Sequence, residues 1–211
     1  MRGPEQYAAE VAARPDKLLK AAFQLFSQRS IDSVTIEAVA KQAGLTSRTL
    51  VRHFCGKPAL VVETATWAWQ NFLEENRKNR KNPGELSAAE DYKFFLDSFL
   101  ALYRDHRDLL RFNQFFNVYV SSEQISGDGL SPYQGLMNTL RERFRAVYAK
   151  GKEDGTLRAE IAEENMFSAT LHLMLAAVTR YAVGLVYKGG VSPEEELILL
   201  RDMLLEKYTA Q

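Results

Sequence analysis

The sequence has few cysteines and no long apolar runs. Its 211 residues include one cysteine, Cys55, which excludes an internal disulfide and a metal site made of several cysteines. No apolar run approaches the ~18 residues that a membrane span requires. The N-terminal stretch MRGPEQYAAEVAARPDK lacks the apolar core of a secretory signal. We therefore expect a cytoplasmic protein with no membrane partner.

Acidic residues are also missing from one stretch of the chain. No Asp or Glu occurs between Glu37 and Glu63. The formal charge of the whole chain is zero, but residues 1–60 carry nine basic and five acidic side chains, and the remainder carries 18 and 22. A basic segment can be the electrostatic footprint of a nucleic acid, although an imbalance of this size also occurs by ordinary scatter. Four cations lie in the acid-free stretch: Lys41, Arg48, Arg52 and Lys57.

Apolar residues recur at helical spacing along almost the whole chain, and no segment alternates with the period of a β-strand. We predict an all-α fold of about nine helices, with a three-helix domain at residues 1–60 and a larger helical domain at 61–211. The eighth helix is expected at about 161–187 and the ninth at about 192–208. Helix N-caps are predicted from the sequence at Thr35, Thr46 or Ser47, Ser87, Ser131 and Ser192.

The acid-free stretch has the pattern of a helix-turn-helix. Gly44 lies where the first short helix must end and reverse, and the second helix carries short polar and basic side chains. An α-helix fits the DNA major groove, and a carboxylate there would be repelled by phosphates. A solvated helix-loop-helix with outward cations is the alternative. The residues expected to reach base edges are Ser47, Arg48, Thr49 and Arg52, and those expected to flank the groove at phosphates are Thr35, His53 and Lys57.

Residues 17–60 also resemble the N-terminal domain of the TetR family of transcriptional regulators, with the spacing intact. The resemblance implies a dimeric repressor with a DNA-binding head and a helical ligand-binding body. It implies phosphate contacts for Thr35, Thr46, His53 and Lys57, and a groove-facing position for Ser47, Arg48 and Arg52. The matching residues are Leu19, Ala21, Ala22, Leu25, Phe26, Thr35, Ile36, Val39, Ala40, Ala43, Gly44, Leu45, Thr46, Thr49, Leu50, His53, Phe54, Lys57 and Leu60.

Two positions depart from the family pattern. Val51 stands where the family usually has an aromatic residue, commonly tyrosine, and could instead touch a thymine methyl group. Ser30 stands where glycine is usual after the first helix, so that turn can take another geometry. The first departure puts the operator sequence beyond prediction.

The stretch 92–119 is rich in aromatic residues. This abundance favours a cavity for a hydrophobic or aromatic ligand, whereas any single aromatic is more often part of the core. His172 could add a polar contact to such a site. The candidate ligand-binding residues are Phe95, Phe99, Tyr103, Phe112, Phe115, Phe116, Tyr119 and His172.

The last two predicted helices carry more apolar surface than one neighbour needs, which is typical of buried or self-associating helices. We predict a four-helix dimer interface, with an ordinary monomeric core as the alternative. A second face of the eighth helix, with Ala169, Ala176, Ala177 and Gly184, could serve instead. The candidate interface residues are Phe167, Leu171, Met174, Val178, Tyr181, Leu185, Leu197 and Leu204.

The sequence thus favours a ligand-released homodimeric repressor that binds a pseudo-palindromic double-stranded DNA operator and a hydrophobic or aromatic effector. A helical adaptor that binds protein but not DNA is the alternative. An enzyme using His172 or His106 is disfavoured because no cofactor motif, metal-ligand spacing or nucleophile–base pair is present. We expect no cofactor and no metal.

Overall fold

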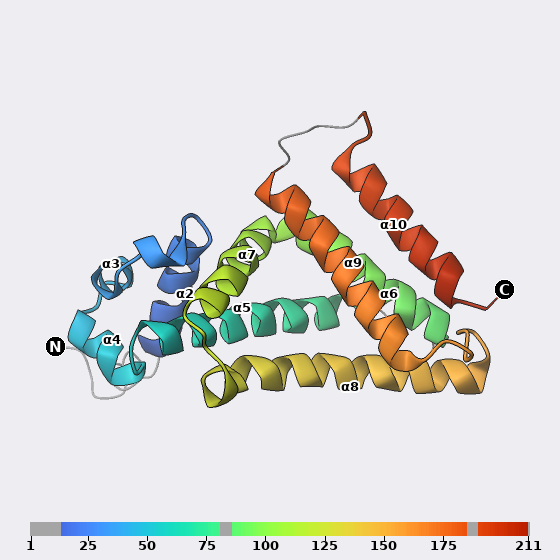
Figure 1. Cartoon of the computed structure of the whole chain (residues 1–211), viewed down its shortest axis with the longest axis horizontal. Helices are drawn as coiled ribbons and strands as arrows, with labels where there is room; N and C mark the ends of the chain where they lie inside the picture. Colours follow the sequence, from blue (N-terminus) through green and yellow to red (C-terminus); the bar gives the residue numbers. More distant parts are fainter. Residues whose placement is uncertain (1–13, 81–85, 185–189, 211) are drawn as a thin grey trace. The chain divides into compact units, whose positions relative to one another are not determined.

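The computed structural model describes residues 14–80, 86–184 and 190–210, which form nine α-helices and two short 3-10 helices without a β-strand (Figure 1). The all-α prediction is therefore confirmed. In chain order the elements are α2 (Arg14–Phe26), η1 (Ile31–Ser33), α3 (Ile36–Gln42), α4 (Ser47–His53), α5 (Lys57–Asn79), α6 (Ala88–Asp105), α7 (Arg107–Ser122), η2 (Gly127–Leu130), α8 (Ser131–Asp154), α9 (Glu163–Val183) and α10 (Pro193–Tyr208).

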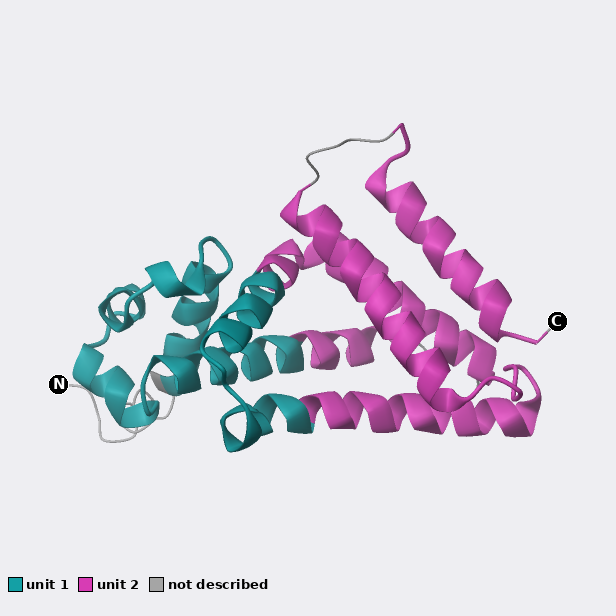
Figure 2. Cartoon of the chain, viewed as in Figure 1, with its two compact units in different colours: residues 1–71, 112–135 teal, residues 72–111, 136–211 magenta. Residues whose placement is uncertain are grey.

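Contacts divide the chain into two units (Figure 2). Unit 1 comprises Met1–Asn71 and Phe112–Gly135, and unit 2 comprises Phe72–Arg111 and Leu136–Gln211. Helices α5, α7 and α8 each contribute residues to both units. The three short helices that carry the helix-turn-helix pattern lie wholly within unit 1.

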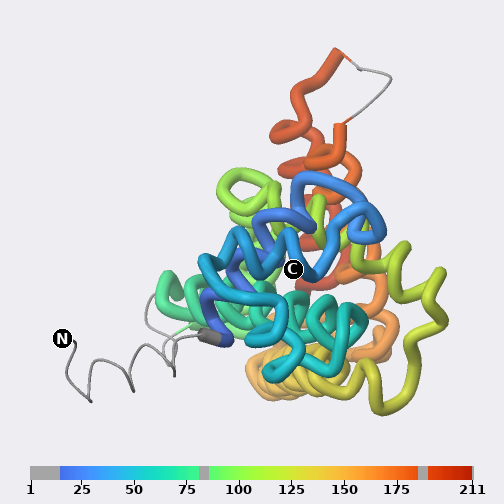
Figure 3. The backbone as a smooth tube through the Cα atoms, turned by 90° about the vertical axis from the view of Figure 1, so that its left-hand side faces the viewer, coloured from blue at the N-terminus to red at the C-terminus, as the bar shows by residue number. Residues whose placement is uncertain are grey.

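Helices α2, α3 and α4 pack against one another in all three pairs and can be followed in blue to cyan in Figure 3. Their inward side chains Leu18, Val39 and Leu50 are buried. Phe112, from the part of α7 that belongs to unit 1, stacks on Phe26 with ring centroids 6.3 Å apart. The apolar i, i+4 pattern of α2 thus forms the core of unit 1, as amphipathic helices require.

In unit 2, α6, α9 and α10 also pack in all three pairs. Capping boxes at Ser87 and Ser192 begin α6 and α10, which confirms both sequence predictions. In the interior, the hydroxyls of Tyr92 and Thr170 lie 2.8 Å apart, so the two buried polar groups satisfy each other. Burial raises the pKa of Tyr92 far above its usual range, so this hydroxyl stays protonated.

The expected capping box at Ser131 is wrong. Ser131 has φ −51° and ψ −43°, which are helical values, whereas an N-cap residue is extended. The 3-10 helix η2 leads directly into α8, so the serine is already the first residue of that helix. The eighth predicted helix also ends earlier, at Val183.

Helix α9 is long and apolar enough to cross a membrane by length and composition alone. This is weak evidence for a span, because the core helix of a soluble protein passes the same test. Its residues Met166, Met174 and Val178 are buried inside unit 2, and its remaining apolar surface includes the exposed Leu173 and Val183.

Two glycines of α8 should respond oppositely to alanine. A Cβ at Gly151 would lie 2.5 Å from the Leu157 side chain, so Gly151→Ala should destabilise the fold by about 1–3 kcal/mol through overpacking. A Cβ at Gly135 meets nothing within 4 Å, so Gly135→Ala should stabilise it by roughly 0.5–1 kcal/mol through helix propensity. Urea denaturation measures both effects, and a stabilising Gly151→Ala would contradict the packing described here.

Candidate nucleic-acid interface and effector cavity

The turn between α3 and α4 is fixed by backbone hydrogen bonds around a left-handed glycine. Gly44 has φ +67°, a conformation that L side chains rarely adopt. Its N–H donates to the carbonyl of Lys41 at 3.1 Å, and the N–H of Leu45 donates to the carbonyl of Ala40 at 2.9 Å. This pair of bonds is a Schellman motif, which satisfies the last carbonyls of α3 and reverses the chain.

Helix α4 then begins at a threonine cap. Thr46 is extended, and its Oγ1 accepts the N–H of Thr49 at 3.2 Å. The two threonine hydroxyls also lie 3.0 Å apart, so either one can donate to the other. The sequence left Thr46 and Ser47 open as caps, and the structure places Thr46 there. The cap aligns the short helix from its first turn.

One face of α4 is buried and the opposite face is free. Leu50 is buried against α2 and α3, whereas Arg48 and Arg52 are exposed. Neither arginine pairs with a carboxylate among the described residues. The exposed face therefore presents two uncompensated guanidinium groups, with Ser47 and Thr49 partly exposed beside them. Guanidinium groups of this kind can bind guanine or phosphate with two hydrogen bonds.

The residues that flank α4 are held by local bonds. Lys57 Nζ donates to the carbonyl of Asp32 at 3.2 Å and lies 5.8 Å from the ring centroid of Tyr119. An ammonium group has three donors, so further ones remain for a phosphate. Thr35 caps α3 by accepting the N–H of Ala38 at 3.1 Å, which leaves its own O–H free to donate. His53 is partly exposed, with Nε2 buried and without a hydrogen-bond partner in the described residues.

The two departures from the family pattern have different consequences. Ser30 has φ −50° and its carbonyl accepts the hydroxyl of Ser33 at 2.7 Å, so the chain turns through η1 without a left-handed residue. A glycine is therefore not needed at that position. Val51 is 55% exposed beside the arginines, which places an apolar side chain on the free face of α4.

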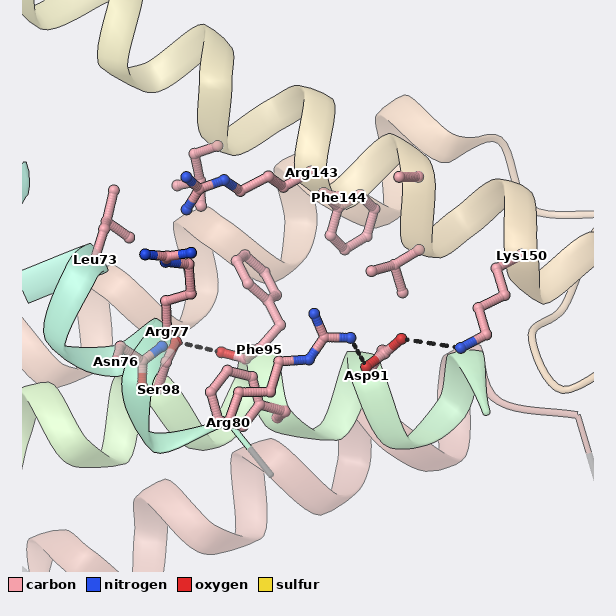
Figure 4. A pocket seen from close by; sticks show the side chains of 14 residues that line it. Leu73, Asn76, Arg77, Arg80, Asp91, Phe95, Ser98, Arg143, Phe144 and Lys150 are labelled. Atoms are coloured by element: carbon pink, nitrogen blue, oxygen red, sulfur yellow. Dashed lines mark hydrogen bonds and ion pairs between the residues drawn. The ribbon is translucent and has the colours of Figure 1, made fainter. Parts of the chain in front are cut away.

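Unit 2 contains a cavity of about 470 Å³ between the last turns of α5, the first half of α6 and α8 (Figure 4). This volume falls within the roughly 300–1,000 Å³ typical of small-molecule sites. Its apolar wall includes the rings of Phe95 and Phe144, whose centroids are 5.4 Å apart. The cavity is lined by Leu73, Asn76, Arg77, Arg80, Asp91, Phe94, Phe95, Ser98, Leu140, Arg143, Phe144, Ala146, Val147 and Lys150.

The buried carboxylate of Asp91 joins two cations across this cavity. Asp91 is only 5% exposed, and one of its oxygens accepts a hydrogen bond from Arg80 at the end of α5. Its other oxygen lies 3.3 Å from Nζ of Lys150 on α8, which also donates to the carbonyl of Leu86. A buried carboxylate is tolerated only when it is paired in this way. Within the described residues no group of three or more His, Cys, Asp and Glu side chains could hold a metal.

Comparison with known proteins agrees with this geometry. The sequence model for bacterial regulatory proteins of the tetR family matches residues 18–64, which contain the whole α3–turn–α4 segment. The chain is also 25% identical over 174 residues to the HTH-type transcriptional repressor KstR2 of Rhodococcus jostii, which covers 82% of each chain. Over residues 18–64 this chain is thus similar to the TetR family of transcriptional regulators.

Solved structures share the fold of this chain over nearly its full length. A transcriptional regulator from Saccharomonospora viridis in complex with choline has a TM-score of 0.74 at 16% identity, covering 95% of this chain and 100% of that one. FadR from Bacillus subtilis in complex with stearoyl-CoA has a TM-score of 0.67 at 15% identity, covering 90% and 95%. At these identities the likeness shows the fold alone.

The aromatic residues predicted as a ligand site do not gather in one place in this structure. Phe95 lines the cavity of unit 2. The others that are buried serve the cores of the two units. For example, the ring of Phe116 packs at a tilt against that of Tyr133 in unit 1, with centroids 4.9 Å apart. His172 is exposed. The residues that do not line the cavity are Phe99, Tyr103, Phe112, Phe115, Phe116, Tyr119 and His172.

The residues predicted at the dimer interface mostly face the interior of the same chain. Leu171 and Tyr181 are partly exposed, and Leu185 lies outside the described residues. The exposed large apolar side chains of α9 and α10 are instead Leu173, Val183, Leu199 and Met203. The predicted residues buried in their own subunit are Phe167, Met174, Val178, Leu197 and Leu204.

The threonine cap of α4 should be needed for the DNA binding expected of this chain. Thr46→Ala removes the acceptor for the N–H of Thr49 and should cost about 1 kcal/mol of stability and weaken DNA binding. Thr46→Ser keeps a capping hydroxyl and should retain both. Thermal unfolding and gel shift measure these effects, and indistinguishable alanine and serine variants would contradict the role of the cap.

Proposed function

We propose that this chain is a TetR-family regulator, a cytoplasmic homodimeric repressor that releases a pseudo-palindromic operator when a small effector binds, and that it is not an enzyme. Residues 1–60 form its DNA-binding domain and residues 61–211 its effector-binding and dimerisation domain. The observation that carries the proposal is the free cationic face of α4, with Arg48 and Arg52 exposed above a capped and tightly turned helix start.

In this proposal α4 enters the major groove. Arg48 and Arg52 face base edges, because they lie on the side of the helix opposite the buried Leu50, and the partly exposed Ser47 and Thr49 reach base edges from its first turn. Phosphate contacts come from the residues that flank α4, which fix the register of the helix without reading sequence. These flanking residues are Thr35, Thr46, His53 and Lys57.

Dimerisation in this proposal uses the outward faces of α9 and α10. These helices contact each other, and together they expose the four large apolar side chains Leu173, Val183, Leu199 and Met203. Apolar surface of this kind is costly to leave in water. In a two-fold symmetric dimer, the same surface of the second subunit would cover it. The dimer then presents two copies of α4 to half-sites ~34–36 Å apart, one turn of the duplex.

Helix α5 is one continuous element that connects the cavity wall to the proposed DNA-binding domain. It begins at Lys57, four residues after the end of α4, and its last turns carry Leu73, Asn76 and Arg77 into the cavity wall. An effector that favours one position of this helix end needs only ~1–3 kcal/mol of coupling to change operator affinity by about 5–150-fold. The repressor role rests on the name of the KstR2 relative, and binding of a small molecule on the choline and stearoyl-CoA complexes.

Removing the free arginines should weaken DNA binding in a sequence-specific way. Arg48→Ala should cost about 1–3 kcal/mol on the selected operator and relax the preference at one base position. Lys57→Gln should weaken binding to all DNA sequences alike. It should also reduce the slope of log affinity against log salt concentration by about the contribution of one phosphate contact. Gel shifts with operator fragments selected from the source genome measure both effects.

Lys78→Gln provides the matched control, because it removes one exposed cation from α5 in unit 2. It should leave operator binding unchanged. If wild-type protein retained no fragment selectively at any salt concentration, the proposed operator binding would be refuted.

The dimer interface can be tested at two exposed residues of α10. Leu199→Arg together with Met203→Arg should convert the dimer to a monomer, because the interface would have to bury two charges on each subunit. Val118→Arg replaces a residue that is 57% exposed on α7 and should leave the dimer intact. Sedimentation velocity measures the mass, and a wild-type protein that is monomeric at all concentrations would refute the dimer.

A further inference from the structure

The charges that line the cavity of unit 2 are strongly biased towards one sign. Four basic side chains reach it, and Asp91 is the only acidic one. A cavity that bound a cation or a purely apolar ligand would not require this excess of positive charge. The four basic residues are Arg77, Arg80, Arg143 and Lys150.

Asp91 neutralises only two of these four cations. Its two oxygens are taken by Arg80 and by Lys150, and it is almost fully buried. No carboxylate of the described chain pairs with Arg77 or Arg143, and both line the cavity while remaining exposed to solvent. These two guanidinium groups are thus available to a ligand.

Arg77 and Arg143 approach the cavity from different helices. Arg77 belongs to the last turns of α5 and Arg143 to the middle of α8, and in Figure 4 both guanidinium groups lie towards the Leu73 end of the cavity. The Asp91–Lys150 pair lies at the other end. Two planar guanidinium groups that reach one region match the oxygens of a carboxylate or phosphate better than any neutral group does.

We propose that the effector is an amphipathic anion whose carboxylate or phosphate head binds Arg77 and Arg143, while its apolar body lies against Phe95, Phe144 and Val147. This assignment rests on the proposed function and names the chemical class of its effector. The head stays near solvent, because both arginines are exposed, which limits the cost of desolvating it. Because the two arginines belong to α5 and α8, one bound anion would link both helices.

Matched ligands that differ only in head group provide the test. Calorimetric titration of the wild-type full-length chain with decanoate and decyl phosphate should give binding roughly tenfold to hundredfold tighter than with decanol, the gain expected for charge-assisted hydrogen bonds. Decyltrimethylammonium should bind more weakly than decanol. The tighter of the two anions identifies the head group. Equal binding of all four ligands, or a preference for the cation, would overturn the assignment.

Variants of the two arginines locate the site. Arg77→Gln and Arg143→Gln should each lose most of the preference for the anions over decanol. Lys78→Gln and Arg145→Gln remove the same charge from neighbouring positions of α5 and α8 that do not line the cavity, and should keep the preference. Retained decanol binding shows that a variant is folded. If all four variants lost the preference alike, the anion would be binding to general surface charge.

The two proposals fail in distinguishable ways. A protein that retains its operator but binds decanoate and decanol equally would overturn the anionic effector alone. A protein that prefers the anions through Arg77 and Arg143 but retains no DNA fragment would overturn the regulator function and leave the anion site standing.

Discussion

The proposed DNA-binding surface depends on one constraint, the left-handed turn at Gly44 followed by the threonine cap at Thr46. The turn closes the carbonyl end of α3, and the cap satisfies the amide end of α4. Between them these bonds orient a helix of only seven residues, which would not be stable in isolation. With Leu50 buried beneath it, α4 has one remaining free face, and that face carries Arg48 and Arg52.

The larger part of the chain repeats this use of capped, packed helices to position charged side chains. In unit 2 the buried Asp91 joins Arg80 and Lys150, so the ends of α5 and α8 are held to the first turn of α6. Arg77 and Arg143 line the same cavity and pair with no carboxylate of the described residues. The continuity of α5, from Lys57 to Asn79, means that one element takes part both in the cavity wall and in the unit that contains α4.

The sequence was most informative where signals are local. The caps at Thr35, Ser87 and Ser192 and the reversal at Gly44 depend on residues within one helical turn, so their pattern predicted the structure. The failure at Ser131 has the same origin, because the S-x-x-Q pattern cannot show that a 3-10 helix precedes it.

Features that combine distant segments could not be predicted in the same way. Aromatic abundance in 92–119 does not distinguish core from cavity, and most of those rings pack in the two cores. Arg77 lies in a polar stretch that was interpreted only as a helix end, and Arg143 carried no local signal; only the packing of α5 and α8 brings them to one cavity. The heptad-like seam of α9 packs within its own subunit, because α6 and α10 supply its partners.

Methylation protection of guanine N7 atoms in a bound operator tests the central claim most directly, because N7 lies in the major groove where α4 is expected to bind. The account predicts two clusters of protected guanines about one duplex turn apart, with protection in both clusters lost in Arg48→Ala or Arg52→Ala. Operator guanines without N7 protection in the wild-type complex, or protection that is unchanged in both variants, would contradict it.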